Sequence, residues 1–124
     1  MCGDLPSDTD GFERVLGEWV AAGITHVVDV RSEWNDADRV GDAAPSLDYT
    51  WLGTHDEGGT QDAAWFEAGV DAITMALGDP AARVVVHCHM GVNRAPSLAF
   101  AVMMELGRGI EDALEAIRTA RPIA

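Results

Sequence analysis

The sequence predicts an α/β domain with a mainly parallel central sheet flanked by helices. Short runs of β-branched residues alternate along the chain with longer segments whose apolar residues recur at helical spacing. The length of 124 residues suits one domain, and no internal repeat is present. In such a fold ligands bind at the carboxyl ends of the strands, so we expect the functional site there.

A helix, two strands and a long loop are expected in the first half of the chain. The helix has one apolar stripe, begins near Asp10, which would cap it, and ends at Gly23. Apolar runs over residues 25–30 and 48–52 indicate two strands. Residues 31–45 are polar without a sustained period, so we expect a loop with one helical turn.

Three helices and one strand are expected in the second half. Apolar residues at helical spacing indicate a helix over 66–77, and a β-branched run indicates a buried strand over 84–86. Residues 95–106 are apolar on nearly every side, which predicts a central helix. A last helix over 110–117 has acids at its start and arginines, including Arg121, near its end, which matches the helix dipole.

A tight loop beginning at Cys88 and ending at Arg94 joins the strand over 84–86 to the helix that follows. Such a loop points several backbone N–H groups, and the positive end of the helix dipole, into one concavity that suits an anion. Gly91 allows the backbone to turn sharply there. The pattern therefore predicts an anion-binding site.

The residue types at the two ends of this loop suit phosphate chemistry. Only a thiolate is a useful nucleophile, and helix N-termini with nearby cations lower the pKa of a cysteine to roughly 3.5–7.5. Arginine stays charged, and its planar fork can bind two phosphate oxygens at once. A buried structural thiol is the alternative for Cys88, but Arg94 six positions later favours the nucleophile.

The string His87-Cys88-x-x-Gly91-x-x-Arg94 resembles the H-C-x-x-G-x-x-R signature of the cysteine-dependent protein tyrosine phosphatases, and the short chain is similar to their small dual-specificity branch. The resemblance implies hydrolysis of a phosphate monoester through a phosphocysteine. Cys88 is then the nucleophile, and His87 is a buried residue that orients the loop and helps to keep the thiol ionised. The phosphate-binding loop is formed by His89, Met90, Gly91, Val92, Asn93 and Arg94.

The leaving oxygen requires a proton from a carboxylic acid or a histidine on another loop. Four residues are candidates: His55, Asp56, Glu57 and Asp62. In the small dual-specificity enzymes that the chain resembles, the acid lies about thirty residues before the cysteine, on a loop after a strand. We therefore expect Asp56 to be the general acid, with Glu57 as the reserve; the alternative is an ordinary solvated carboxylate.

Ala95 departs from the family pattern, which usually has serine or threonine directly after the arginine. In the family this hydroxyl is thought to stabilise the thiolate as it leaves in the second step. We therefore expect slower breakdown of the phosphocysteine intermediate. The short chain also implies a shallow pocket that admits phosphoserine, phosphothreonine or phosphotyrosine.

The charge balance restricts the partners. The 21 acidic and 8 basic residues give a net charge of −13, which disfavours nucleic acid and acidic membrane surfaces. Cys2 and Cys88 are not a disulfide framework, and a nucleophilic thiol would be lost in an oxidising compartment, so we expect a cytoplasmic protein. The expected substrate is a phosphorylated protein or a small phosphomonoester, and the oligomeric state stays open.

No cofactor is needed for this reaction, and no metal is expected. Adjacent side chains on a strand, such as those of His87, Cys88 and His89, point to opposite faces, and no second cluster completes a metal site. Asp29 and Arg31, at the end of their strand, either contact the rim of the active site or form a structural ion pair, and we expect the ion pair. Three tryptophans near the ends of elements either line a substrate mouth or, as is usual for such aromatics, belong to the core, which we expect: Trp34, Trp51 and Trp65.

Other functions stay open. A phosphate-binding pseudophosphatase would have Arg94 and the loop but would turn over too slowly to matter. Ala95 favours this alternative, whereas Cys88 argues against this alternative. A rhodanese-like sulfurtransferase or an arsenate reductase also uses a cysteine in an anion-binding loop, and the latter needs a resolving thiol, for which only Cys2 is available. Because the family usually continues beyond such a C-terminal segment, residues 1–124 are expected to be one catalytic domain, either truncated at both ends or minimal.

Overall fold

The computed structural model describes residues 3–55 and 61–124. In chain order these residues form α1 (Thr9–Ala21), β1 (His26–Arg31), α2 (Ala37–Ala43), β2 (Asp48–Thr54), α3 (Ala63–Leu77), β3 (Val84–His87), α4 (Arg94–Glu105) and α5 (Ile110–Ala120). The alternation of helices and strands confirms the predicted α/β class.

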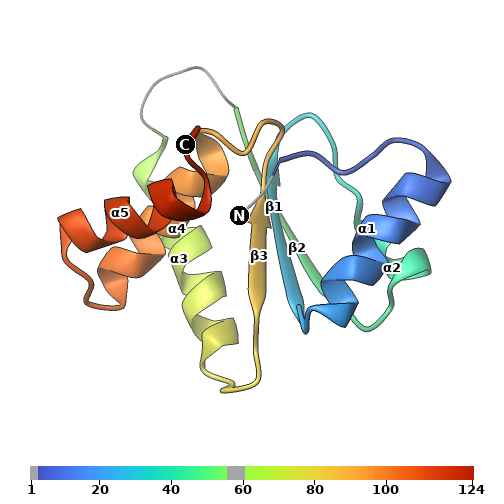
Figure 1. Ribbon diagram of the computed structural model, residues 1–124, viewed down its shortest axis with the longest axis horizontal. Helices are drawn as coiled ribbons and strands as arrows, with labels where there is room; N and C mark the ends of the chain where they lie inside the picture. Colours follow the sequence, from blue (N-terminus) through green and yellow to red (C-terminus); the bar gives the residue numbers. More distant parts are fainter. Residues whose placement is uncertain (1–2, 56–60) are drawn as a thin grey trace.

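The three strands form a parallel sheet in the order β2-β1-β3. In β1, His26 lies opposite Asp48 of β2 and Val84 of β3, so all three strands begin at the same edge. Their carboxyl ends therefore meet at the other edge, where the segments that follow β1 and β3 begin (Figure 1). This is the edge at which the sequence predicts the functional site.

Helices cover both faces of the sheet, with α1 and α2 on one side and α3, α4 and α5 on the other (Figure 1). Alternate strand residues point to opposite faces. Val27 and Val85 accordingly belong to the core under α1 and α2, and Val28 and Val86 to the core under α3 and α4. These buried side chains fix the register, because a slip of one residue would turn each of them to the wrong face.

Two helices differ from the sequence-based expectation. Asp8, rather than Asp10, caps α1, because its carboxylate accepts a hydrogen bond from the N–H of Gly11 at 2.7 Å, whereas Asp10 lies in the first turn. The segment expected to be a loop with one helical turn contains the seven-residue helix α2. Only Val40 of α2 is buried. The segment therefore has no apolar stripe from which a helix could be predicted.

Helix α4 packs against α3, α5 and the sheet, as its apolar sequence predicted (Figure 1). Its first turn is buried, including the side chains of Arg94 and Ala95, so the helix N-terminus points into the molecule at the carboxyl edge of the sheet. Among the described residues, no helix is both long enough and apolar enough to span a bilayer.

Candidate active site

The loop between β3 and α4 closes around the sulfur of Cys88. The backbone N–H of Gly91 lies 3.2 Å from Cys88 Sγ, and the N–H of Ala95 lies 3.5 Å from it. Gly91 makes this turn with a φ of +67°, a conformation that favours glycine. Cys88 is a free thiol of which only 1% is exposed. The sulfur thus lies within reach of two peptide N–H groups, which hydrogen-bond a thiolate better than a neutral thiol.

The side chain of Arg94 contacts the loop after β1 and the last residue of β2. Its Nη1 lies 2.9 Å from Glu33 Oε1 and donates to the carbonyl of Thr54 at 2.9 Å, while its Nη2 donates to Glu33 Oε2 at 3.2 Å. Glu33 follows β1, and Thr54 is the last residue of β2. The side chain of Arg94 is therefore oriented by residues from the carboxyl ends of the other two strands, β1 and β2.

Glu33 is a site residue that the sequence did not single out. Burial opposes ionisation of its carboxyl group, but the hydrogen bonds and the positive charge of Arg94 outweigh burial and hold the pKa of Glu33 below its usual range. The carboxylate is therefore ionised at neutral pH. Its side chain is 38% exposed, so it lies at the rim of the site rather than within the core.

His87 is fully buried beside the thiol. Neither of its ring nitrogens has a hydrogen-bond partner within residues 3–55 and 61–124, although Nε2 lies 3.6 Å from Asp29 Oδ2. Burial lowers the pKa of His87 more than the charge of Asp29 raises it, so the imidazole is neutral near pH 7. The ring packs against Trp19, with the two centroids 5.9 Å apart. The ring is thus held by packing, and its predicted role of orienting the loop stays a prediction.

Asp29 and Arg31 form the expected ion pair, within a larger buried network. Arg31 Nε lies 2.9 Å from Asp29 Oδ1, and its Nη2 lies 2.7 Å from Asp29 Oδ2 and 2.6 Å from Asp36 Oδ2. The Asp4 carboxylate and the hydroxyl of Tyr49, which donates to Asp29, complete the network. Burial raises the pKa of Asp29, but its hydrogen bonds to Arg31 and Tyr49 outweigh burial and lower it.

Asp56 and Glu57, the predicted general acid and its reserve, lie outside the described residues. The structure places the two other candidates in ordinary roles: His55 Nδ1 lies 3.2 Å from Ser32 Oγ, and Asp62 caps α3 by accepting a bond from the N–H of Ala64. Since Thr54 O contacts Arg94, the end of β2 reaches the site two residues before Asp56. The assignment of Asp56 stays a prediction.

The side chains of His89 and Met90, in the first half of the phosphate-binding loop, are exposed. His89 Nδ1 lies 2.8 Å from Asp4 Oδ2, and the ring of Trp34 lies over His89 with centroids 6.0 Å apart. Met90 is 57% exposed.

Trp34 is half exposed and Trp51 is 41% exposed, so the expectation that these two tryptophans belong to the core is wrong. Trp34 instead lies at the rim of the loop.

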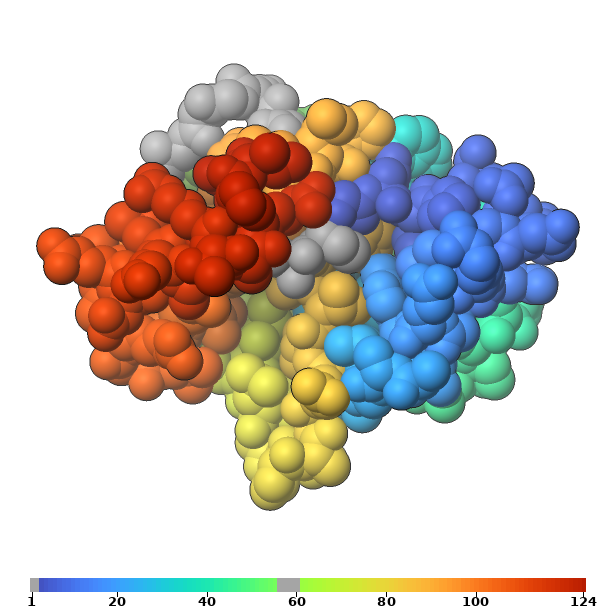
Figure 2. Space-filling view, in the orientation of Figure 1, coloured from blue at the N-terminus to red at the C-terminus, as the bar shows by residue number. Residues whose placement is uncertain are grey.

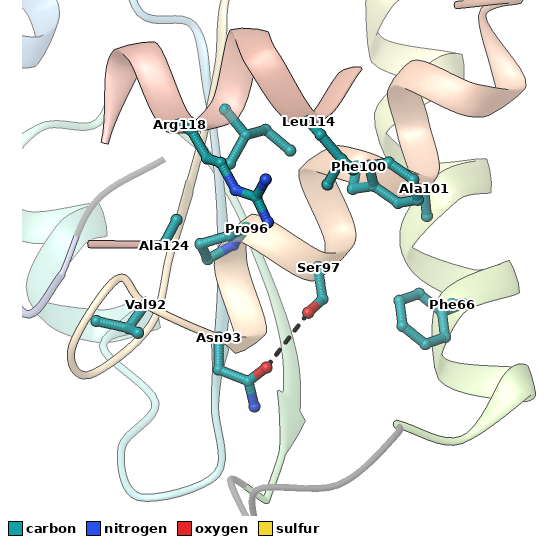
Figure 3. Close-up of a pocket in the computed structure, with 11 residues that line it drawn as sticks. Phe66, Val92, Asn93, Pro96, Ser97, Phe100, Ala101, Leu114, Arg118 and Ala124 are labelled. Carbon is teal, nitrogen blue, oxygen red and sulfur yellow. Dashed lines mark hydrogen bonds between the residues drawn. The ribbon is translucent and has the colours of Figure 1, made fainter. Parts of the chain in front are cut away.

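An apolar cavity of about 550 Å³ borders the second half of the loop. Figure 3 shows Val92 and Asn93 at one end of it, with side chains of α4 and α5 beyond them. Asn93 precedes α4, and its side-chain oxygen accepts a hydrogen bond from Ser97 at 3.4 Å. The loop therefore lies between the buried network of Asp29 and Arg31 on one side and this apolar cavity on the other.

Comparisons with known proteins agree with this geometry. Residues 17–124 match the family model described as dual specificity phosphatase, catalytic domain. Dual specificity protein phosphatase 26 is 35% identical over 85 residues in Bos taurus and 33% identical in Homo sapiens; each alignment covers 66% of this chain and 39% of the relative. The chain therefore spans well under half the length of these relatives.

Solved structures share the fold over most of the chain. The crystal structure of human DUSP28 superposes with a TM-score of 0.78 at 21% identity, covering 100% of this chain and 80% of that one. The structure of Tk-PTP in the active form gives a TM-score of 0.75 at 22% identity, covering 90% and 76%. On the family match, the signature and the loop geometry together, this chain belongs to the dual specificity phosphatase family.

Proposed function

We propose that this chain hydrolyses phosphate monoesters through a phosphocysteine intermediate, as a protein tyrosine and dual-specificity phosphatase. The observation that carries the proposal is the convergence of the N–H groups of Gly91 and Ala95 on Cys88 Sγ, at 3.2 and 3.5 Å, at the N-terminus of α4. A thiolate held in this way can attack phosphorus, and the same loop suits the oxygens of the phosphoryl group.

Each step has a residue of this chain to perform it. The Cys88 thiolate attacks phosphorus in line while Arg94 and the loop N–H groups bind the equatorial oxygens, and Asp56 gives its proton to the departing oxygen. Water then attacks the phosphocysteine, with ionised Asp56 as its base, and the sulfur leaves as thiolate. The neighbouring Glu33 carboxylate keeps Arg94 oriented through both steps.

The substrate class follows from the family and from the charge of the chain. The curated relatives are named dual specificity protein phosphatases, which supports phosphorylated proteins as substrates here. A net charge of −13 supports neither nucleic acid nor anionic membranes as partners. A reduced, nucleophilic Cys88 supports a cytoplasmic location.

Ala95 supports a second candidate, a phosphate-binding pseudophosphatase. Its side chain is fully buried next to the sulfur and offers no hydroxyl to the leaving thiolate. Such a protein would form the phosphocysteine and release phosphate very slowly. The two candidates differ in the rate of the second step and not in the geometry of phosphate binding.

Hydrolysis of p-nitrophenyl phosphate by the native chain and by Cys88→Ser tests the proposal. We expect repeated turnover by the native chain and none by the variant. Rapid acid quench followed by mass spectrometry should show one phosphoryl group on Cys88 of the native chain. One equivalent of nitrophenol without further turnover would favour the pseudophosphatase. Activity that survives Cys88→Ser would exclude the phosphocysteine mechanism.

A further inference from the structure

Arg121, at the end of α5, reaches back to the phosphate-binding loop 30 residues earlier. Its Nε donates to the carbonyl of Gly91 at 2.6 Å, and its Nη2 donates to the carbonyl of Met90 at 2.7 Å. Figure 2 shows the C-terminal segment, coloured red, packed close to the orange loop. One guanidinium therefore holds two successive peptide carbonyls of the loop.

Holding these carbonyls also orients the N–H groups that face the sulfur. In a trans peptide the carbonyl of one residue and the N–H of the next point in opposite directions. The Met90 carbonyl is bound by Arg121, and the N–H on the other side of the same peptide, that of Gly91, lies 3.2 Å from Cys88 Sγ. By the same geometry, the bond from Arg121 to the Gly91 carbonyl directs the N–H of Val92 away from Arg121.

Gly91 and Arg121 are also fitted to each other. A β-carbon on Gly91 would lie 2.6 Å from Nε and 2.7 Å from Nη2 of Arg121, which is far closer than atoms can approach. A side chain at position 91 would therefore displace the guanidinium from the loop, and the φ of +67° independently favours glycine there. The contact thus depends on the absence of a side chain at Gly91.

We propose that Arg121 is a positioning residue for the phosphatase reaction. It does not touch the reacting atoms. It binds the outward carbonyls of Met90 and Gly91 and so fixes the N–H of Gly91, which holds the Cys88 thiolate, and the N–H of Val92, which is directed toward the side of the loop that receives the phosphoryl oxygens. A positive donor on a carbonyl also polarises the peptide and strengthens the hydrogen bond that its N–H donates. The proposed role of Arg121 in phosphate binding rests on the proposed phosphatase function. Its proposed role in holding the thiolate does not depend on that function.

Two measurements on Arg121→Ala and Arg121→Lys test this role, with Arg108→Ala as the matched control. Arg108 lies exposed in the turn between α4 and α5, so its loss changes the net charge equally without touching the loop. The first measurement is the rate of alkylation of Cys88 by iodoacetamide against pH. The second is kcat/KM for p-nitrophenyl phosphate.

For Arg121→Ala we expect the midpoint of the alkylation profile to move to higher pH and kcat/KM to fall about ten-fold. Arg121→Lys should recover part of both effects, because an ammonium can donate to a carbonyl but lacks the fixed fork. Arg108→Ala should match the native chain. If Arg121→Ala does not fold, Arg121→Gln, which keeps one donor group, should show the same two shifts.

An alkylation profile and a kcat/KM that both stay native in folded Arg121 variants would overturn the proposal. Equal losses in Arg108→Ala would overturn it too, because they would reflect charge alone. If the native chain turns over no aryl phosphate, the phosphatase function fails, but the alkylation profiles still decide whether Arg121 acts on the thiolate.

Discussion

Glu33 and Arg94 are 61 residues apart in the chain and share three contacts: Nη1 lies 2.9 and 3.2 Å from the two carboxylate oxygens, and Nη2 lies 3.2 Å from Oε2. The pair connects the loop after β1 to the first residue of α4. An arginine that binds phosphate oxygens through its planar guanidinium contributes more to the rate when the orientation of that plane is fixed before the substrate binds. The carboxylate of Glu33 fixes this orientation.

Glu33→Ala should lower kcat/KM for an aryl phosphate. A charge-assisted hydrogen bond contributes about 1.5–3 kcal/mol, and the partial exposure of Glu33 reduces this to about 1 kcal/mol, or roughly five-fold in rate. Glu33→Gln keeps an acceptor oxygen and should lose less. Glu18→Ala, which breaks the exposed Arg14–Glu18 pair on α1, is the control and should behave as the native chain. A rise in kcat/KM for Glu33→Ala would instead mean that Glu33 competes with phosphate for Arg94.

Asp56→Asn should slow hydrolysis by about 10²- to 10⁴-fold for substrates with poor leaving groups, because general acid catalysis contributes that much. The loss should be larger for phenyl phosphate than for p-nitrophenyl phosphate, whose leaving oxygen needs no proton. The fall in kcat/KM at high pH should also disappear. If Glu57→Gln shows this pattern and Asp56→Asn does not, the general acid is the reserve candidate.

Ala95→Ser should speed the breakdown of the phosphocysteine. The backbone N–H at this position lies 3.5 Å from Cys88 Sγ, so a serine hydroxyl would be placed near the sulfur that must leave as a thiolate. Stopped-flow measurements with p-nitrophenyl phosphate should show a smaller initial burst and a faster steady state. The added hydroxyl is buried and costs about 1–3 kcal/mol of stability if it finds no partner. An unchanged burst would show that breakdown of the intermediate does not limit the native rate.

The parts of this structure that could be predicted are those that leave a local signal. The strands over 84–87 and 26–31 contain short runs of apolar residues. Cys88 and Arg94 belong to one motif that can be recognised within a few positions of the sequence. Glu33 had no such signal, because it lies in a polar, aperiodic stretch and acquires its role from a partner 61 residues away. Arg121 looked like an ordinary cation at a helix C-terminus. Its contact with the loop depends on how α5 packs, which no local pattern specifies.

His87 should make the stability of the protein depend on pH in the range just below 6.5. Its pKa in the native state lies below 6.5, the value expected in the unfolded chain, because the imidazole is buried. The unfolded state therefore binds more protons in this range, so the free energy of unfolding rises with pH. The contribution is complete above about pH 6.5 and is lost as the pH falls toward the native pKa, with a slope of at most about 1.4 kcal/mol per pH unit.

Urea unfolding of the native chain, His87→Gln and His55→Gln at several pH values measures this slope. His87→Gln should have a flatter dependence on pH than the native chain, whatever its absolute stability, because the buried titrating group is gone. His55→Gln is the matched control, because it removes an exposed imidazole and leaves the buried ring in place. The carboxyl groups of Asp29 and Glu33 have lowered pKa values, so they act mainly below this range. Identical slopes in all three proteins would mean that the His87 imidazole titrates alike in both states, and that its burial does not hold it neutral.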